Sequence, residues 1–198
     1  MIDDRTIAVY DAKAEDYARL VHKSKPDEHL RAFIGDLPKG AHVLDLGCGP
    51  AKASSFMREA GLVPDPVDAS ESMVKLANET FDIGARVGRF DEIDGVEVYD
   101  GIWANFSLLH AAEEELPHHI AALSTALKPN GVFHIAMKVG EGTRRDALDR
   151  RYTFVTEAGL RHLLEDVGLT IVDQDAGEEA GLDGTVSPWI MYRARKDG

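Results

Sequence analysis

The chain has one cysteine, few basic residues and no long apolar run, and each shortage excludes a class of protein. A lone Cys48 cannot form an internal disulfide, which fits a reducing cytoplasm. No apolar stretch approaches the length of a spanning helix, and the acidic start Met1–Asp4 does not resemble a signal peptide. With 22 basic against 35 acidic residues, the net charge is −13. We therefore expect a cytoplasmic protein with neither a nucleic-acid nor a membrane partner.

The most informative segment present is residues 43–50, which read Val-Leu-Asp-Leu-Gly-Cys-Gly-Pro. Here a short apolar strand carrying Asp45 passes directly into a turn with Gly47 and Gly49, where the backbone can approach a ligand closely. A dinucleotide fingerprint needs a third glycine at the position of Lys52, and the Gly-Lys-Ser/Thr of a phosphate loop is absent. Asp45 would also repel phosphate. The turn therefore fits neither phosphate-binding loop, and its carboxylate suits a ligand with an ammonium or hydroxyl group.

Apolar runs alternate with helix-like stretches along the chain, which is typical of a parallel α/β sheet with helices on both faces. The expected strands are 42–46, 63–68, 85–89, 99–105, 131–137, 169–173 and 189–195, the last at an edge of the sheet, with a turn at 128–131. The expected helices are 51–60, 70–80 with Ser70 as N-cap, 113–127 and 156–167. Pro64 and Pro66 weaken the second strand. No linker divides the chain, so we expect one domain over 1–198, with a helical N-terminal cap formed by 1–36.

Polar residues follow four of these strands in an order that suits one ligand site. Asp68 ends the second strand 19 residues after Gly49, where a carboxylate can accept hydrogen bonds from ribose hydroxyls. Residues 89–91 follow the third strand, and residues 105–110 leave the fourth. Taken singly, Asp68 is more often a helix cap, and His110 is more often structural. Their joint order favours a site, because ligands bind beyond the carboxyl ends of strands in an open α/β sheet.

The segment 43–50 resembles the first motif of class I S-adenosylmethionine-dependent methyltransferases. The resemblance continues through residues 10–20, 99–105, 108–110, 127–131 and 150–152. These segments are similar to a bacterial small-molecule branch of the family, which is often labelled tellurite-resistance-like. It implies a Rossmann-like, doubly wound sheet of seven strands in the order 3-2-1-4-5-7-6, the last strand antiparallel. It also implies S-adenosylmethionine as methyl donor. Ala51 departs from the pattern where a further glycine is usual, and Arg89 where an aspartate is usual.

The resemblance also assigns roles to particular residues. Asp45, Gly47 and Gly49 would contact the methionine moiety, Asp68 the ribose and Phe90 the adenine, while Asn105 would line the methionine end. The full set expected to bind the cofactor is Tyr10, Tyr17, Asp45, Gly47, Cys48, Gly49, Asp68, Ala69, Met73, Arg89, Phe90, Asp91 and Asn105. Cys48 alone is equally explained as a small buried side chain.

Catalysis by methyl transfer depends mainly on aligning the acceptor with the sulfonium, and a general base is needed only if the acceptor keeps its proton. His110 and Tyr152 are the candidate catalytic residues. The locally basic segment 138–151 has two interpretations: a solvated loop with surface ion pairs, or arginines that recognise an anion on the acceptor. The arginines concerned are Arg144, Arg145, Arg150 and Arg151.

No metal site is expected, because adjacent His118 and His119 on a helix point about 100° apart and lack further ligands. The predicted function is methyl transfer to a small molecule by a monomer or weak homodimer. Two alternatives stay open. One is a protein that binds S-adenosylmethionine or its product without turnover, as a sensor or partner subunit. The other is the same fold with another nucleotide.

Overall fold

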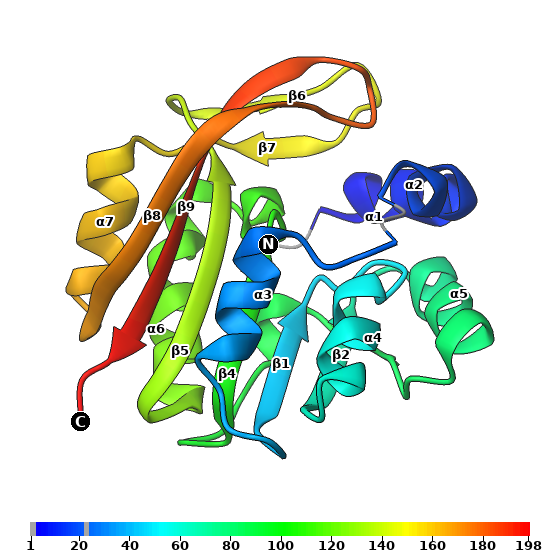
Figure 1. The fold of residues 1–198 in the computed structure, drawn as a ribbon. Coiled ribbons are helices and arrows are strands. Elements are labelled where there is room, and N and C mark those ends of the chain that lie inside the picture. Colours follow the sequence, from blue (N-terminus) through cyan, green and yellow to red (C-terminus); the bar gives the residue numbers. More distant parts are fainter. Residues whose placement is uncertain (1–2, 22–23) are drawn as a thin grey trace.

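The computed structural model describes residues 3–21 and 24–198, and its centre is a seven-stranded sheet in the order β3-β2-β1-β4-β5-β9-β8 (Figure 1). The strands are β1 (His42–Leu46), β2 (Val63–Asp68), β3 (Arg86–Val87), β4 (Tyr99–Asn105), β5 (Leu127–Lys138), β8 (Leu169–Ala180) and β9 (Val186–Lys196). Neighbours from β3 to β5 pair in parallel, and β9 pairs antiparallel with both β5 and β8. This order confirms the doubly wound fold expected from the resemblance.

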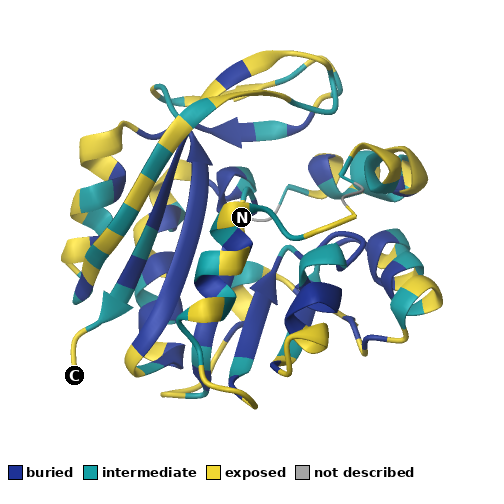
Figure 2. Cartoon of the chain, in the orientation of Figure 1, coloured by how far each residue is buried: buried dark blue, intermediate teal, exposed yellow. Residues whose placement is uncertain are grey.

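Apolar side chains of the central strands point alternately to the two faces of the sheet and form a hydrophobic core on each face. Val43 and Trp103 pack with Phe33 on one face, in a cluster that includes Leu30. Leu44 and its neighbours on β4 and β5 pack on the other face against Leu116, Ile120 and Leu123. Because successive side chains of a strand point to opposite faces, both faces of these strands are buried, as the dark central strands in Figure 2 show.

The helices beside the sheet follow the predicted pattern with shifted ends. They are α1 (Asp4–Ala12), α2 (Ala14–Leu20), α3 (Glu28–Gly35), α4 (Lys52–Glu59), α5 (Glu71–Phe81), α6 (Leu116–Ala126) and α7 (Glu157–Glu165), with short 3₁₀ turns η1 (Phe90–Glu92), η2 (Leu108–His110) and η3 (Glu113–Glu115). Ser70 caps α5, as predicted, by accepting from Met73 N at 3.1 Å. The N-terminal segment is broken into three helices, because Lys13 leaves the helical conformation and Asp27 starts a new helix as its N-cap.

Four predictions about strands need correction. The strand predicted at 85–89 keeps only Arg86 and Val87, and the turn predicted at 128–131 is the start of β5, with Asn130 at φ +63°. The last strand, β9, is not at an edge: it lies between β5 and β8, and β8 takes the edge. The reason is that 169–173 continues to Ala180, so β8 and β9 form one long antiparallel hairpin.

The prolines of β2 are compatible with the sheet because of where their missing N–H groups would point. Val63 N donates to Ala41 O on the side of β1, at 2.9 Å. Successive N–H groups of a strand alternate sides, so Pro64 and Pro66 face β3. There β3 pairs only with Val67 and Asp68, so neither proline removes a ladder bond.

A second, two-stranded sheet was not predicted from the sequence. It consists of β6 (Thr143–Arg145) and β7 (Arg151–Thr153). The first lies within the basic segment 138–151, and the second begins at its last residue. Figure 1 shows this pair beside the far end of the β8–β9 hairpin, above the carboxyl ends of β4 and β5. Together with α1 and α2, these elements surround the edge of the sheet where the predicted site residues lie.

Candidate functional site

Two adjoining cavities lie at the carboxyl ends of the parallel strands. The first has a volume of about 340 Å³ and the second about 530 Å³. The residues that line both are Tyr10, Tyr17, Gly47, Gly49, Asn105, Phe106 and His110. Six further residues that were expected to bind a cofactor line the first cavity alone, namely Asp68, Ala69, Met73, Arg89, Phe90 and Asp91. Asp45, Cys48 and Tyr152 line only the second.

The glycine turn after β1 requires glycine for two reasons. Gly47 has φ +70° and Gly49 has φ +52°, in the left-handed region that other residues adopt at a cost. A Cβ on Gly47 would lie 2.4 Å from the Ser107 Cβ, so the turn packs directly against the chain leaving β4. A Cβ on Gly49 would lie 3.4 Å from the Tyr17 ring, which places α2 over the turn. The turn therefore joins the sheet to the N-terminal helices.

Asp45 precedes this turn, is buried, and lines the second cavity but not the first. Its carboxylate accepts a hydrogen bond from the Ser54 hydroxyl at 2.6 Å. Burial raises the pKa of Asp45 to about 7, although the Ser54 hydrogen bond works in the opposite direction. The group is therefore close to half-protonated at neutral pH, and a cationic neighbour would favour its charged form.

Asp68 holds the glycine turn and the start of α5 together. Its two oxygens accept from Gly49 N at 2.8 Å and from Ser70 N at 2.9 Å. Burial raises the pKa of Asp68, opposed by these backbone donors. Each carboxylate oxygen keeps a further lone pair, and the side chain lines the first cavity, so it can still accept from a ligand hydroxyl.

Asp11 of α1 reinforces this corner and was not predicted from the sequence. Its carboxylate accepts from the Ser70 hydroxyl at 2.6 Å and from Ser72 N at 3.1 Å, at the start of α5. This cap comes from a residue 59 positions earlier, so no local signal could have shown it.

The residues after β3 form the far wall of the first cavity. Phe90 meets the His119 ring edge-on at 5.7 Å between centroids, and both side chains line the cavity. The Arg89 guanidinium lies 3.7 Å from the Asp4 carboxylate of α1, and the backbone N–H of Arg89 donates to the Glu92 carboxylate. Arg89 therefore ties this wall to the N-terminal helices, a contact that an aspartate there could not make.

The segment leaving β4 separates the two cavities. The side-chain oxygen of Asn105, Oδ1, lies 2.9 Å from His134 Nε2, which fixes the orientation of the side-chain amide. Phe106 follows at φ +55°, an unusual conformation for an aromatic residue, and lines both cavities. Phe106 belongs to the segment 105–110 that strand order brings to the site, but the sequence indicates no role for its side chain.

His110 sits in a chain of hydrogen bonds at the junction of the cavities. Its Nδ1 lies 2.6 Å from the Arg151 carbonyl oxygen, which only accepts, so Nδ1 carries the proton. Nε2 then accepts from the Tyr10 hydroxyl at 2.9 Å. Burial lowers the pKa of His110 to about 4, so the imidazole is neutral at pH 7. The other predicted catalytic residue, Tyr152, packs edge-on against His110 at 4.9 Å between centroids.

The four arginines of the basic segment divide between surface and site. Arg144 stacks on Phe154, and Arg145 pairs with Asp3 at 2.7 Å; neither lines a cavity. Arg150 lines the second cavity, but Asp146 binds it at 2.6 Å and it donates to the Tyr10 hydroxyl. Arg151 lines the first cavity and donates to the His110 carbonyl oxygen at 2.9 Å. Arg144 and Arg145 therefore make surface contacts, as the first interpretation expects, whereas Arg150 and Arg151 line the cavities and their recognition of an anion stays a prediction.

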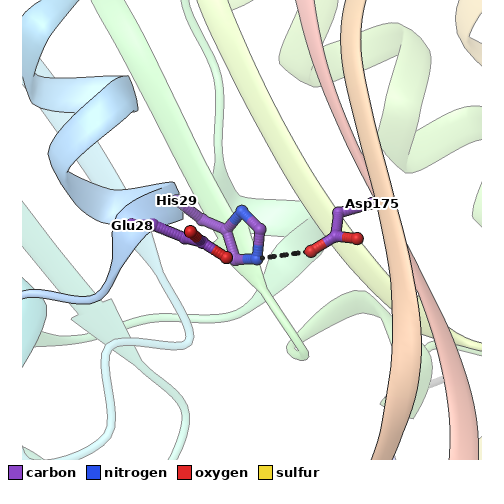
Figure 3. A group of neighbouring side chains, drawn as sticks. All are labelled: Glu28, His29 and Asp175. Atoms are coloured by element: carbon purple, nitrogen blue, oxygen red, sulfur yellow. Dashed lines mark ion pairs between the residues drawn. The ribbon is translucent and has the colours of Figure 1, made fainter.

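The two adjacent histidines on α6, His118 and His119, line the first cavity. A separate group brings possible metal ligands together: Glu28 and His29 on α3 and Asp175 on β8 (Figure 3). His29 Nε2 lies 3.2 Å from the Asp175 carboxylate, and both carboxylates are exposed. An ion pair between α3 and the edge strand explains this group.

The comparisons with known proteins agree with this geometry. The family described as "Methyltransferase domain" matches residues 15–174, so the chain belongs to the methyltransferase-domain family, as the class I resemblance predicts. A trans-aconitate 2-methyltransferase from Delftia acidovorans is 31% identical over 121 residues, 58% of this chain and 44% of that protein. The chain spans less than half the length of the curated relatives it matches.

Two solved structures share the fold. One is a Burkholderia thailandensis 1,6-didemethyltoxoflavin-N1-methyltransferase with bound 1,6-didemethyltoxoflavin and S-adenosylhomocysteine, with TM-score 0.73, 21% identity and coverage of 98% of this chain and 88% of that chain. The other is TehB from Haemophilus influenzae, with TM-score 0.73, 17% identity and coverage of 93% and 67%. Over the part of the chain that the structure describes, no helix is long and apolar enough to cross a membrane.

Proposed function

We propose that the protein is an S-adenosylmethionine-dependent methyltransferase that moves a methyl group to a small molecule. The observation that carries this proposal is the pair of adjoining cavities, which share seven lining residues at the carboxyl ends of the strands. One cavity would hold the methyl donor and the other the acceptor, so the two ligands would meet at Asn105, Phe106 and His110.

The first cavity fits the donor in its chemistry. Asp68 keeps lone pairs for the two ribose hydroxyls, Phe90 and Met73 offer apolar contact to the adenine, and the glycine turn leaves room for the methionine part. S-adenosylmethionine, when bound, supplies an already activated sulfonium methyl. In this proposal residues 1–198 are one methyltransferase domain, and the N-terminal helices close over the donor through Tyr10 and Tyr17, which exclude water.

The second cavity would position the acceptor, and such positioning can supply roughly 7–11 kcal/mol. For an acceptor that must lose a proton, His110 and Tyr10 form a relay. Tyr10 Oη would take the proton while its own proton passes to His110 Nε2, along the existing 2.9 Å hydrogen bond. Tyr152 would hold the imidazole in place through ring packing. The low pKa of His110 keeps its imidazole neutral at pH 7, so that Nε2 can accept a proton.

The relatives support a small acceptor. The Delftia protein is named for trans-aconitate, and the Burkholderia structure holds 1,6-didemethyltoxoflavin. The net charge of −13 fits the same class of acceptor better than a nucleic acid.

Calorimetry with S-adenosylmethionine, S-adenosylhomocysteine and NAD tests the donor assignment. We expect the first two to bind and NAD not to bind. Asp68→Asn should weaken S-adenosylhomocysteine about tenfold to hundredfold, because a carboxylate acceptor is lost. Asp65→Asn is the matched control: Asp65 lies on the same strand, pairs with Arg86, and lines neither cavity. Equal effects of the two changes, or tight NAD binding, would refute the assignment.

A non-catalytic binder of S-adenosylmethionine or its product is the second candidate. It is favoured by one observation: both nitrogens of His110 are already engaged, by Arg151 O and by Tyr10. A methyl-transfer screen over small carboxylates, thiols, phenols and amines separates the two. Transfer that depends on Tyr10 and His110 supports the enzyme, whereas donor binding without any transfer supports the binder.

A further inference from the structure

The second cavity contains a cation that is buried yet has no oxygen partner. Two basic side chains are buried in the part of the chain that the structure describes: Arg150, with 1% exposed, and Lys138, with 7%. Three N–H groups of Arg150 already donate to the Asp146 carboxylate and the Tyr10 hydroxyl. The Lys138 ammonium instead lies 4.4 Å from the centre of the Tyr152 ring. Among residues 3–21 and 24–198, Lys138 Nζ makes neither a hydrogen bond nor an ion pair.

The backbone holds Lys138 firmly in this position. It is the last residue of β5, pairs with Trp189 of β9, and accepts from Val155 N at 3.1 Å. The side chain lines the second cavity and not the first. The ammonium thus meets the cavity without a bound acceptor, and a ligand oxygen there can form a charge-assisted hydrogen bond with it.

We propose that Lys138 is the specificity-determining residue of the second cavity and that it selects an acceptor bearing a carboxylate. This inference rests on the proposed function, because it assigns the second cavity to the acceptor. The ring face of Tyr152 fixes the ammonium by a cation–π contact, so the charge is presented to the cavity in one place.

The surroundings favour one carboxylate over a phosphate or a polyanion. Glu179 also lines this cavity, and Asp183 lies close enough to act on the charge of Lys138. Asp183 is held by the Thr185 N–H and hydroxyl, at 3.0 and 2.9 Å. The charge of Arg150 is balanced by Asp146. A single carboxylate matches the one ammonium that has no hydrogen-bonded acceptor, whereas a dianionic phosphate would be repelled more strongly by Glu179 and Asp183.

Binding of matched acids and amides to the full chain loaded with S-adenosylhomocysteine tests the proposal. The pairs are 4-hydroxybenzoate with 4-hydroxybenzamide, 3-phenylpropanoate with 3-phenylpropanamide, and glutarate with glutaramide; 4-hydroxyphenyl phosphate serves as the phosphate probe. We expect at least one acid to bind about tenfold to hundredfold more tightly than its amide, and the phosphate to bind more weakly than the acid. If no acid exceeds its amide, the proposal is wrong, with or without any variant.

Variants assign the preference to the residue. Lys138→Met should remove the preference for the acid, and Lys138→Arg should retain most of it, because methionine has similar length and arginine keeps the charge. Lys128→Met is the matched control. Lys128 lies at the other end of β5 and pairs with Asp100 at 2.8 Å, so its loss changes net charge equally and should leave the preference intact. A preference that survives in Lys138→Met overturns the proposal.

A spectroscopic readout separates recognition from a structural role. Burial lowers the pKa of Lys138, so a bound carboxylate should raise it, and the acid but not the amide should shift its side-chain NMR signals. S-adenosylhomocysteine affinity, measured first for every variant, separates this proposal from the previous one. If that ligand does not bind wild-type protein, the proposed function has failed; if it binds and acids show no preference, only the role of Lys138 has failed.

Discussion

The two cavities share a wall, but the chain builds them from different kinds of contact. The first is formed by short turns that directly follow β1, β2, β3 and β4, and Asp68 and Gly49 meet through backbone N–H groups. The second shares the glycine turn but adds side chains from β5, β7 and the β8–β9 hairpin, which meet through tertiary packing. Turns with positive φ and backbone donors suit a ligand that is the same throughout a family. Side chains on hairpins suit a ligand that differs between members.

Charge is also handled differently on the two sides. In the first cavity Asp68 is satisfied by N–H groups of the chain itself. In the second, the Lys138 ammonium packs on the Tyr152 ring and has no hydrogen-bonded acceptor, although Asp183 acts on its charge from further away. The first cavity is therefore complete before a ligand arrives, and the second leaves a charge for the ligand to satisfy.

The strongest test of this contrast is Gly47→Ala. The methyl group would enter the left-handed region and overlap the Ser107 Cβ, so the turn must move. We expect S-adenosylhomocysteine affinity to fall about hundredfold or more by calorimetry. Gly40→Ala is the control, since Gly40 has φ +80° but nothing within 4 Å of an added Cβ. It should cost stability alone, about 1 kcal/mol, with unchanged affinity. Similar affinities for the two variants would show that the turn does not shape the donor cavity.

The second test asks to which cavity Asp45 belongs, since the resemblance assigns it to the donor and the geometry places it beside the second cavity. Burial raises its pKa from 3.8 to about 7, so its contribution to stability is present below pH 3.8 and lost as pH rises through 7. Asp45→Asn lacks this loss and keeps an acceptor for Ser54. We expect it to be more stable than wild type by about 2–4 kcal/mol at pH 8, with the difference vanishing near pH 4.

His110 does not disturb this measurement. Its lowered pKa adds stability above pH 6.5 that is lost as pH falls through about 4, but it does so equally in both proteins. Chemical denaturation at several pH values gives the difference directly. If Asp45→Asn also weakens S-adenosylhomocysteine, Asp45 serves the donor; if it weakens only a carboxylate probe or acceptor, it serves the second cavity. A difference in stability that does not change with pH would contradict the assigned ionisation.

The same contrast explains what the sequence could and could not predict. Asp45, Gly47, Gly49 and Asp68 stand at the ends of strands, so strand order alone brings them to one edge of the sheet. The contact of Asp11 and the backbone conformation of Phe106 could not be found this way. Asp11 reaches α5 across 59 residues, and the positive φ of Phe106 has no glycine to indicate it.

The prediction that residues 189–195 form an edge strand was wrong for a related reason. Residues 189–195 carry an alternation that fits either an edge or an interior strand, and only pairing with the extended β8 decides between them. The hairpin of β6 and β7 lies in a polar segment whose fold depends on Asp146, Arg150 and Asp3 rather than on an apolar period. Long-range polar contacts of this kind leave little trace in local sequence.

The smallest effect is expected for Ala51→Gly, which restores the residue usual at this position in the family. Ala51 has φ +57°, and relieving that conformation should gain about 1–2 kcal/mol. Its methyl group is fully buried, and losing it costs about 0.8 kcal/mol, while a glycine makes the unfolded chain more flexible at a similar cost. The terms nearly cancel, so thermal and chemical denaturation should show a change below about 1 kcal/mol, with unchanged S-adenosylhomocysteine affinity. A larger gain would mean that the methyl contributes little packing, and tighter ligand binding would mean that the strained alanine holds the turn away from its best shape. If neither is seen, the alanine is accepted because its packing offsets its strain, and the donor cavity is complete without the third glycine.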